Sequence, residues 1–210
     1  MASGAPLSAC MVIDYQNIHL TADGLFAPYG THVKDTLVDP LAFAERVLEV
    51  RAELQTLPTP KLVTLAKVHV FRGSPSNARE PILYSVTQRH RAEWTRDARV
   101  QVTYRPLRYP ADWGQRSCVE RPREKGIDVM VALEVVQLAQ FGRYDIVVLA
   151  SHDTDLEPAL EMAAGVGRVK VETAGWQGAR RLRPSGRSLW HTALSGADFV
   201  KTRDRRCYDR

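Results

Sequence analysis

The chain has 210 residues and a hydrophobic fraction of 44%, which suits one domain of ordinary size with a full core. No apolar run approaches the ~20 residues that span a bilayer, and residues 1–9 lack the pattern of a secretory signal. The cysteines Cys10, Cys118 and Cys207 are far apart. This spacing argues against a structural zinc site and a disulfide framework and favours reduced thiols in a cytoplasmic protein.

The net charge of +5 is unevenly distributed along the chain. Residues 168–210 hold 11 Lys and Arg against 4 Asp and Glu, whereas the other residues hold 18 against 20. A nearly neutral body with a basic end indicates an anionic partner, and nucleic acid comes ahead of a membrane. The structural alternative is that the basic end only keeps the protein soluble.

Short apolar runs alternate with stretches of helical period along the chain. A strand over 10–14 is followed by a loop rich in Gly, Pro and Asp. The predicted elements that follow are a helix over 40–56, a strand over 61–71, a helix from 76 or 77 to about 98, a strand over 100–107, an irregular segment over 108–124, a helix over 126–141, a strand over 145–150, a helix over 155–164, a strand over 168–173 and a short strand over 188–191. Strands separated by single helices predict an α/β fold whose mostly parallel sheet is covered by helices on both faces.

Four aspartates lie at the ends of these predicted elements. Asp14 closes the first strand, Asp128 opens the helix before the fourth strand, and Asp153 and Asp155 follow that strand. Ligands of such sheets bind beyond the carboxyl ends of the strands, so the acids meet if the first and fourth strands are neighbours. Converging carboxylates repel one another unless a cation lies between them. The pattern therefore predicts a Mg²⁺ or Mn²⁺ site and phosphodiester chemistry.

Each acid except Asp153 also has a simple structural explanation. Asp14 fits a turn, and Asp128 fits the first turn of a helix, where an acid complements the helix dipole. Asp155 fits the same role in the next helix, where Thr154 and Glu157 have the spacing of a capping box.

Polar and basic side chains near the acids are candidates for contacting a substrate. Asn17, Ser151 and Thr154 are candidates for orienting water or phosphate, Lys125 for pairing with phosphate, and His152 is a weak candidate for a base. The basic end adds candidate phosphate ligands and candidate stacking residues, of which at least one aromatic residue is expected to be in the core. They are Arg180, Arg181, Arg183, Arg203, Arg205 and Arg206, with Trp176, Trp190 and Tyr208.

Residues 12–18, 125–133 and 145–156 together resemble the NYN domain family of the PIN-like nucleases, over roughly residues 8–175. The resemblance implies a Rossmann-like sheet, four acids around Mg²⁺ or Mn²⁺, and RNA cleavage that leaves a 5′-phosphate. By position, the four acids are Asp14, Asp128, Asp153 and Asp155, and Asn17 matches the asparagine of the opening motif.

Two departures from the family pattern concern substrate choice. The family usually has glycine where His152 stands, and the charged segment over 108–124 looks specific to this protein. Residues 176–210 are then a basic C-terminal extension that packs on the nuclease domain or trails from it.

These observations predict a metal-dependent endoribonuclease that acts on single-stranded RNA. A non-catalytic RNA-binding or regulatory module and a nuclease for single-stranded DNA are the alternatives. A Toprim-like enzyme has glutamate as its first acid, and a haloacid dehalogenase phosphatase has Asp-x-Asp at the first strand, where this chain has Gln16. No membrane partner is expected, and a homo-oligomer is possible.

Overall fold

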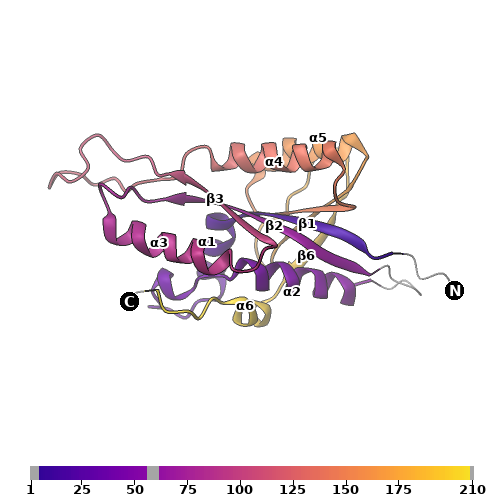
Figure 1. Ribbon diagram of the computed structural model, residues 1–210, viewed down its shortest axis with the longest axis horizontal. Coiled ribbons are helices and arrows are strands. Elements are labelled where there is room, and N and C mark those ends of the chain that lie inside the picture. The colour runs from indigo at the N-terminus through magenta and orange to yellow at the C-terminus, as the bar shows by residue number, and fades with distance from the viewer. Residues whose placement is uncertain (1–4, 56–61, 209–210) are drawn as a thin grey trace.

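A computed structural model describes residues 5–55 and 62–208. Its six strands form one all-parallel sheet in the order β3-β2-β1-β4-β5-β6 (Figure 1). The predicted α/β fold with a mostly parallel sheet is confirmed. The strands are β1 (Leu7–Asp14), β2 (Val63–Ser74), β3 (Val100–Pro106), β4 (Ile146–Ala150), β5 (Lys170–Trp176) and β6 (Trp190–Leu194).

Helices cover both faces of the sheet (Figure 1). They are α1 (Tyr15–Phe26), α2 (Pro40–Glu53), α3 (Pro81–Trp94), α4 (Ile127–Phe141), α5 (Glu157–Val166) and α6 (Gly196–Thr202), with short 3-10 turns η1 (Val33–Asp35) and η2 (Thr154–Leu156). Alternate residues of β1 divide between two cores, since successive strand side chains point to opposite faces. Cys10 and Val12 pack with α4 and α5, whereas Met11 and Ile13 pack with α1, α2 and α6.

The helix α1 differs from the prediction, which placed a loop directly after the first strand. Tyr15, Ile18, His19 and Ala22 are buried at helical spacing, so one stripe of α1 faces the core. The helix α3 also begins later than expected, at Pro81. The preceding residues form a turn closed by a hydrogen bond from the N–H of Glu80 to the carbonyl of Ser76.

The order of the strands reverses between β1 and β4, because β1 leads to β2 and β3 on one side and β4 leads to β5 and β6 on the other. Ile13 pairs with Ala150 in the register of these two strands. Asp14 and Ser151 therefore emerge side by side at the carboxyl edge of the sheet, where α/β folds bind their ligands. The predicted adjacency of the first and fourth strands is confirmed.

Residues 176–208 include β6, which pairs with β5 in the sheet, and α6. The side chains of Trp176 and Tyr208 are only 1% and 7% exposed. The expectation that these two rings stack on unpaired bases is therefore wrong, because they are buried in the core. Within the described residues, none of the helices has the length and apolar character that a bilayer crossing requires.

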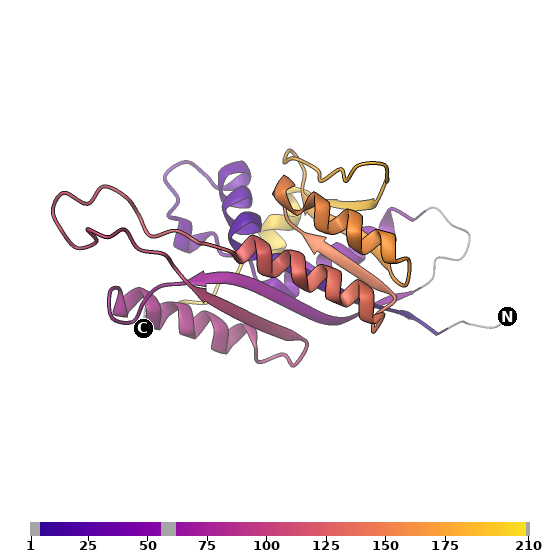
Figure 2. The same cartoon turned by 90° about the horizontal axis from the view of Figure 1, so that it is seen from above.

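Residues 107–124 form a long excursion between β3 and α4 that projects from the body of the domain (Figure 2). We call this segment the arm. Its two limbs are joined at the base by an antiparallel bridge between Arg108 and Arg123. The sequence predicted an irregular segment over 108–124, which agrees with the structure. The composition of this segment did not indicate the bridge between its two limbs.

Candidate functional site

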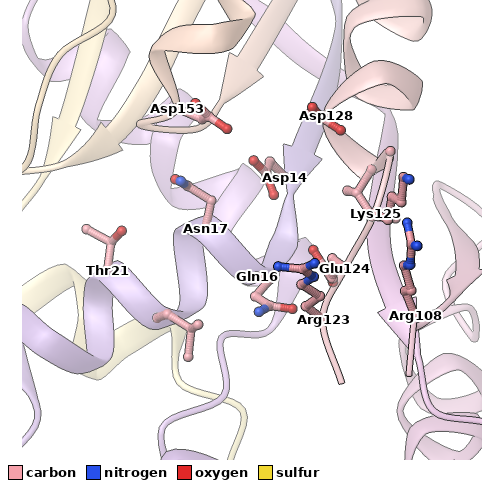
Figure 3. Close-up of a pocket in the computed structure, with 13 residues that line it drawn as sticks. Asp14, Gln16, Asn17, Thr21, Arg108, Arg123, Glu124, Lys125, Asp128 and Asp153 are labelled. Atoms are coloured by element: carbon pink, nitrogen blue, oxygen red, sulfur yellow. The ribbon is translucent and has the colours of Figure 1, made fainter. Parts of the chain in front are cut away.

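A cavity of about 800 Å³ lies at the carboxyl edge of β1 and β4. Asp14, Asp128 and Asp153 line it, although they are far apart in the sequence (Figure 3). Asn17 and Lys125 line the same cavity. The structure thus brings together five of the residues that the sequence singled out.

Asp14 is the most buried acid of the cavity, with 6% of its surface exposed. The pKa of its carboxyl group is raised to about 6, first by burial and then by the negative charges of Asp153 and Asp128. The Ser151 hydroxyl, which donates a 3.0 Å hydrogen bond to Asp14 Oδ2, and the backbone of Asn17 act in the opposite direction. The carboxylate of Asp14 therefore lacks a full set of compensating partners.

The turn after β4 is bonded directly to the start of α1. The buried Ser151 hydroxyl accepts a 3.1 Å hydrogen bond from the N–H of Asp153 while it donates to Asp14. The Asn17 side-chain oxygen accepts a 2.8 Å hydrogen bond from the N–H of His152. These contacts fix the relative positions of the first acid and the acidic turn.

Asp153 caps the short turn η2, because its Oδ1 accepts a 3.0 Å hydrogen bond from the N–H of Asp155. The sequence alone offered no structural explanation for Asp153, and this cap supplies one. Asp155 itself is exposed and does not line the cavity, and neither do Thr154 and Ser151. Of the final acidic pair, only Asp153 faces the cavity.

Asp128 reaches the cavity from the first turn of α4. The helix begins after Gly126, whose φ of 74° is left-handed and therefore suits a residue without a side chain. A Cβ at Gly126 would also lie 3.3 Å from the guanidinium of Arg105. This sharp entry into α4 leaves Lys125 and Asp128 on the wall of one cavity.

A family model and a solved structure each match most of the chain. The model of the NYN domain family matches residues 8–185. The chain belongs to the NYN domain family. NYN domains are generally nuclease domains. Membership of the family therefore supports nuclease activity, and hence a nucleic-acid substrate, for this chain. No curated protein matches the chain.

A crystal structure of a protein of unknown function from Vibrio parahaemolyticus is similar in fold to this NYN domain. The two chains are 17% identical, with 86% of this chain and 88% of the other covered and a TM-score of 0.51. At this identity the likeness concerns the fold alone, and it agrees with the parallel α/β architecture.

Glu124 is an acid of the NYN domain's cavity that the sequence reasoning did not single out. Its Oε1 accepts a hydrogen bond from the N–H of Gly73 on β2. Burial, followed by the negative charge of Asp14, raises the pKa of Glu124. The approach is close, since a Cβ on Gly73 would lie 2.7 Å from Glu124 Cγ. The signal available in the sequence was the position of Glu124 between an unusually long irregular segment and Lys125.

The three aspartates have the oxygen ligands that Mg²⁺ and Mn²⁺ prefer. Within residues 5–55 and 62–208, no three of the His, Cys, Asp and Glu side chains form a ready cage for an ion as they stand. The cavity is an open rim in which a buried, undercompensated Asp14 faces Asp128 and Asp153. Mg²⁺ usually keeps several of its own waters and takes only one or two protein carboxylates, so a closed cage of three acids is not a requirement for that ion.

Three of the six arginines predicted to bind phosphate, Arg180, Arg181 and Arg183, lie elsewhere, on the connection between β5 and β6. The Arg181 side chain donates a 2.6 Å hydrogen bond to the carbonyl of Leu189, and the N–H of Arg183 donates to Glu157 at 2.8 Å. Neither they nor Arg180 lines the acidic cavity. Two arginines that the sequence reasoning did not select, Arg108 and Arg123, line it instead.

His152, which replaces the glycine usual in the family, is bonded to neighbouring backbone. Its Nε2 lies 3.1 Å from the N–H of Trp176, which donates to it, and its Nδ1 lies 2.8 Å from the carbonyl of Arg180. Together these contacts require a neutral ring with the proton on Nδ1. Burial lowers the pKa of His152, in agreement with that state. The ring connects the acidic turn to the β5–β6 connection and does not line the cavity.

Proposed function

We propose that this NYN domain is a metal-dependent endoribonuclease that hydrolyses single-stranded RNA with Mg²⁺ or Mn²⁺. The observation that carries the proposal is the buried carboxylate of Asp14, which shares one cavity with Asp128 and Asp153 at the switch point of the sheet. An unpaired buried carboxylate costs several kcal/mol, and neighbouring carboxylates increase that cost. A divalent cation at this point removes the penalty.

In this proposal Asp14, Asp128 and Asp153 would hold the ion, and Asp155 would complete the site directly or through water. When bound, the ion supplies Lewis-acid chemistry, since it lowers the pKa of a bound water and offsets the charge of the phosphate. Asn17 uses its oxygen to accept from His152, so its amide NH₂ is the part that donates to water or phosphate. Lys125 binds a phosphate oxygen, and Ser151 positions the carboxylate of Asp14.

The reaction is an in-line hydrolysis of one phosphodiester bond. The water oxygen forms a bond to phosphorus and gives up a proton to solvent, while the bond from phosphorus to the 3′ oxygen breaks. That 3′ oxygen takes up a proton. The products are a 5′-phosphate on one fragment and a 3′-hydroxyl on the other.

The test is the cleavage of labelled single-stranded RNA by the purified full chain in Mn²⁺, in Mg²⁺ and in EDTA. Wild type is expected to cut in either metal, and Asp14→Asn is expected to lose at least about 100-fold in rate, as do enzymes that lack a main electrostatic group. Asp97→Asn, a change at a partly exposed acid outside the cavity, is the matched control. Equal cleavage by wild type and Asp14→Asn would contradict the proposal.

A second candidate is a non-catalytic RNA-binding or regulatory module. The observation that favours it is that the acids of the described residues do not form a closed cage. The same experiment separates the two functions, because such a module binds RNA tightly and cuts it in no divalent metal. A parallel reaction on single-stranded DNA of the same sequence determines whether RNA is the preferred substrate.

We assign the activity to the cytoplasm, where the three free thiols of the chain remain reduced.

A further inference from the structure

The acidic cavity has a second, basic wall. Arg108, Arg123 and Lys125 line it together with the three aspartates, and Figure 3 shows these cations along the side of the cavity away from Asp153. Within the described part of the chain, none of the three cations takes part in an ion pair. Their charges therefore remain available for an anionic ligand that enters the cavity.

The basic wall continues out of the cavity along the arm. Arg108 and Arg123 also line a neighbouring hollow of about 150 Å³, whose other charged lining residues are Arg121 and a single acid, Glu120. The two cavities share Arg108 and Arg123, so basic side chains extend from beside the aspartates onto the arm, and we call this row of side chains the track. Phosphate groups recur along a single strand of RNA. Such a track can therefore contact several phosphates of an RNA backbone that extends beyond the cleaved bond.

The backbone at the base of the arm is fixed by hydrogen bonds on both limbs. Arg108 and Arg123 exchange two backbone hydrogen bonds, of 2.9 and 3.0 Å, and the N–H of Leu107 donates to the carbonyl of Ser74 at 2.9 Å. The Tyr109 hydroxyl donates to Glu80 at 2.6 Å and accepts from the N–H of Ser76 at 2.8 Å. Binding to a preorganised base loses less conformational freedom than binding to a mobile loop.

We propose that the base of the arm is the substrate clamp of this domain. Arg108 and Arg123 bind the backbone phosphates next to the scissile phosphate on one side, while Lys125 binds at the scissile phosphate itself. This inference rests on the proposed function and assigns two phosphate-binding residues to the segment that looks specific to this protein. Because the contacts are to phosphate, they give affinity and register and carry no base specificity.

The first test measures binding without turnover. Wild type and Arg108→Gln/Arg123→Gln bind a labelled oligouridylate in EDTA over a series of salt concentrations. Each phosphate contact to a single strand contributes about 0.7 to the slope of log affinity against log salt. The double variant is therefore expected to lose about 1.4 from the slope and to bind about 25-fold more weakly at about 0.1 M salt.

Two further variants separate a clamp from a general charge effect. Arg116→Gln removes a cation from the arm away from both cavities, and its slope is expected to stay within about 0.3 of wild type. Arg108→Lys/Arg123→Lys keeps both charges and is expected to retain most of the slope. A double Gln variant that binds with the slope and affinity of wild type overturns the clamp, and so does an equal loss in Arg116→Gln.

The second test uses turnover and keeps the two proposals distinguishable. In Mn²⁺, wild type is expected to show a lower KM for a long oligouridylate than for a short one. The double Gln variant is expected to lose this difference in KM, and its kcat is expected to change less than its KM. Cleavage with no dependence of KM on the two arginines overturns the clamp and leaves the ribonuclease proposal intact. Arginine-dependent binding by a protein that cuts in no metal supports phosphate binding by the two arginines, but it overturns the ribonuclease proposal and with it their place beside a scissile phosphate.

Discussion

The Ser151 hydroxyl donates a 3.0 Å hydrogen bond to Asp14 Oδ2 and accepts one from the N–H of Asp153. A single buried side chain thus orients the acid at the end of β1 and the acidic turn after β4. Because the bond favours the ionised form of Asp14, it opposes the effect of burial on the pKa of that carboxyl group.

The first prediction concerns Ser151→Ala. Loss of the hydrogen bond is expected to raise the pKa of Asp14 above its present value of about 6, by up to about one further unit. Carboxyl NMR titration of the metal-free protein measures this change directly. Ser117→Ala, which removes an exposed hydroxyl of the arm, is expected to leave the titration of Asp14 unchanged. An unchanged pKa in Ser151→Ala would contradict the role assigned to this contact.

The second prediction concerns the stability of the metal-free protein. Burial raises the pKa of Asp14 from 3.8 to about 6, so folding disfavours its ionised form. The favourable contribution to folding is present below the unfolded pKa and is lost as the pH rises through about 6. Asp14→Asn removes this dependence, and in EDTA at about pH 8 it is expected to be more stable than wild type by up to about 3 kcal/mol.

Urea denaturation at two pH values measures this stability difference. At about pH 4 the gap between wild type and Asp14→Asn is expected to close, because Asp14 is then largely protonated in the folded protein. Added Mn²⁺ is expected to raise the melting temperature of wild type but not that of the variant. If Asp14→Asn is destabilising in EDTA at high pH, the carboxylate of Asp14 is well compensated and the argument for a bound cation loses its support.

Much of the fold was predictable because the strands are short apolar runs with clear ends. β4 and the second half of β1 are buried on both faces, and such strands are recognised in a sequence as continuous apolar segments. The helix α1 was missed because polar residues such as Gln16 and Asn17 alternate with its buried stripe. Its helical state depends on the core that covers Tyr15 and Ile18.

The site was predictable to the extent that it depends on strand order. Asp14 and Asp153 lie beyond neighbouring strand ends, so a parallel sheet alone brings them together. Arg108, Arg123 and Glu124 reach the cavity through the antiparallel base of the arm, and a segment without periodicity gives no signal for that pairing. The position of Asp155 depends on the direction of one turn, which spacing does not determine.

The third prediction concerns a buried ion pair remote from the cavity. Arg51 and Glu172 are 3% and 1% exposed and share two hydrogen bonds, of 2.7 and 2.8 Å. Glu172→Gln leaves a buried guanidinium without its carboxylate, and it is expected to destabilise the protein by about 3–5 kcal/mol. Replacing the pair with Arg51→Met and Glu172→Leu is expected to cost much less, because no charge is then buried alone. Chemical denaturation of the single and double variants compares the two, and equal losses would contradict this account.

The last prediction concerns the packing of His152 on Gly175. A Cβ on Gly175 would lie 2.2 Å from Cε1 of His152, which is far inside van der Waals contact. Gly175→Ala is therefore expected to destabilise the protein by about 1–3 kcal/mol, as overpacked cores do. In His152→Gly the ring is absent, so the same alanine is expected to have little effect. A double-mutant cycle measures this coupling, and additive effects would mean that the ring moves aside freely and does not hold the β5–β6 connection in place.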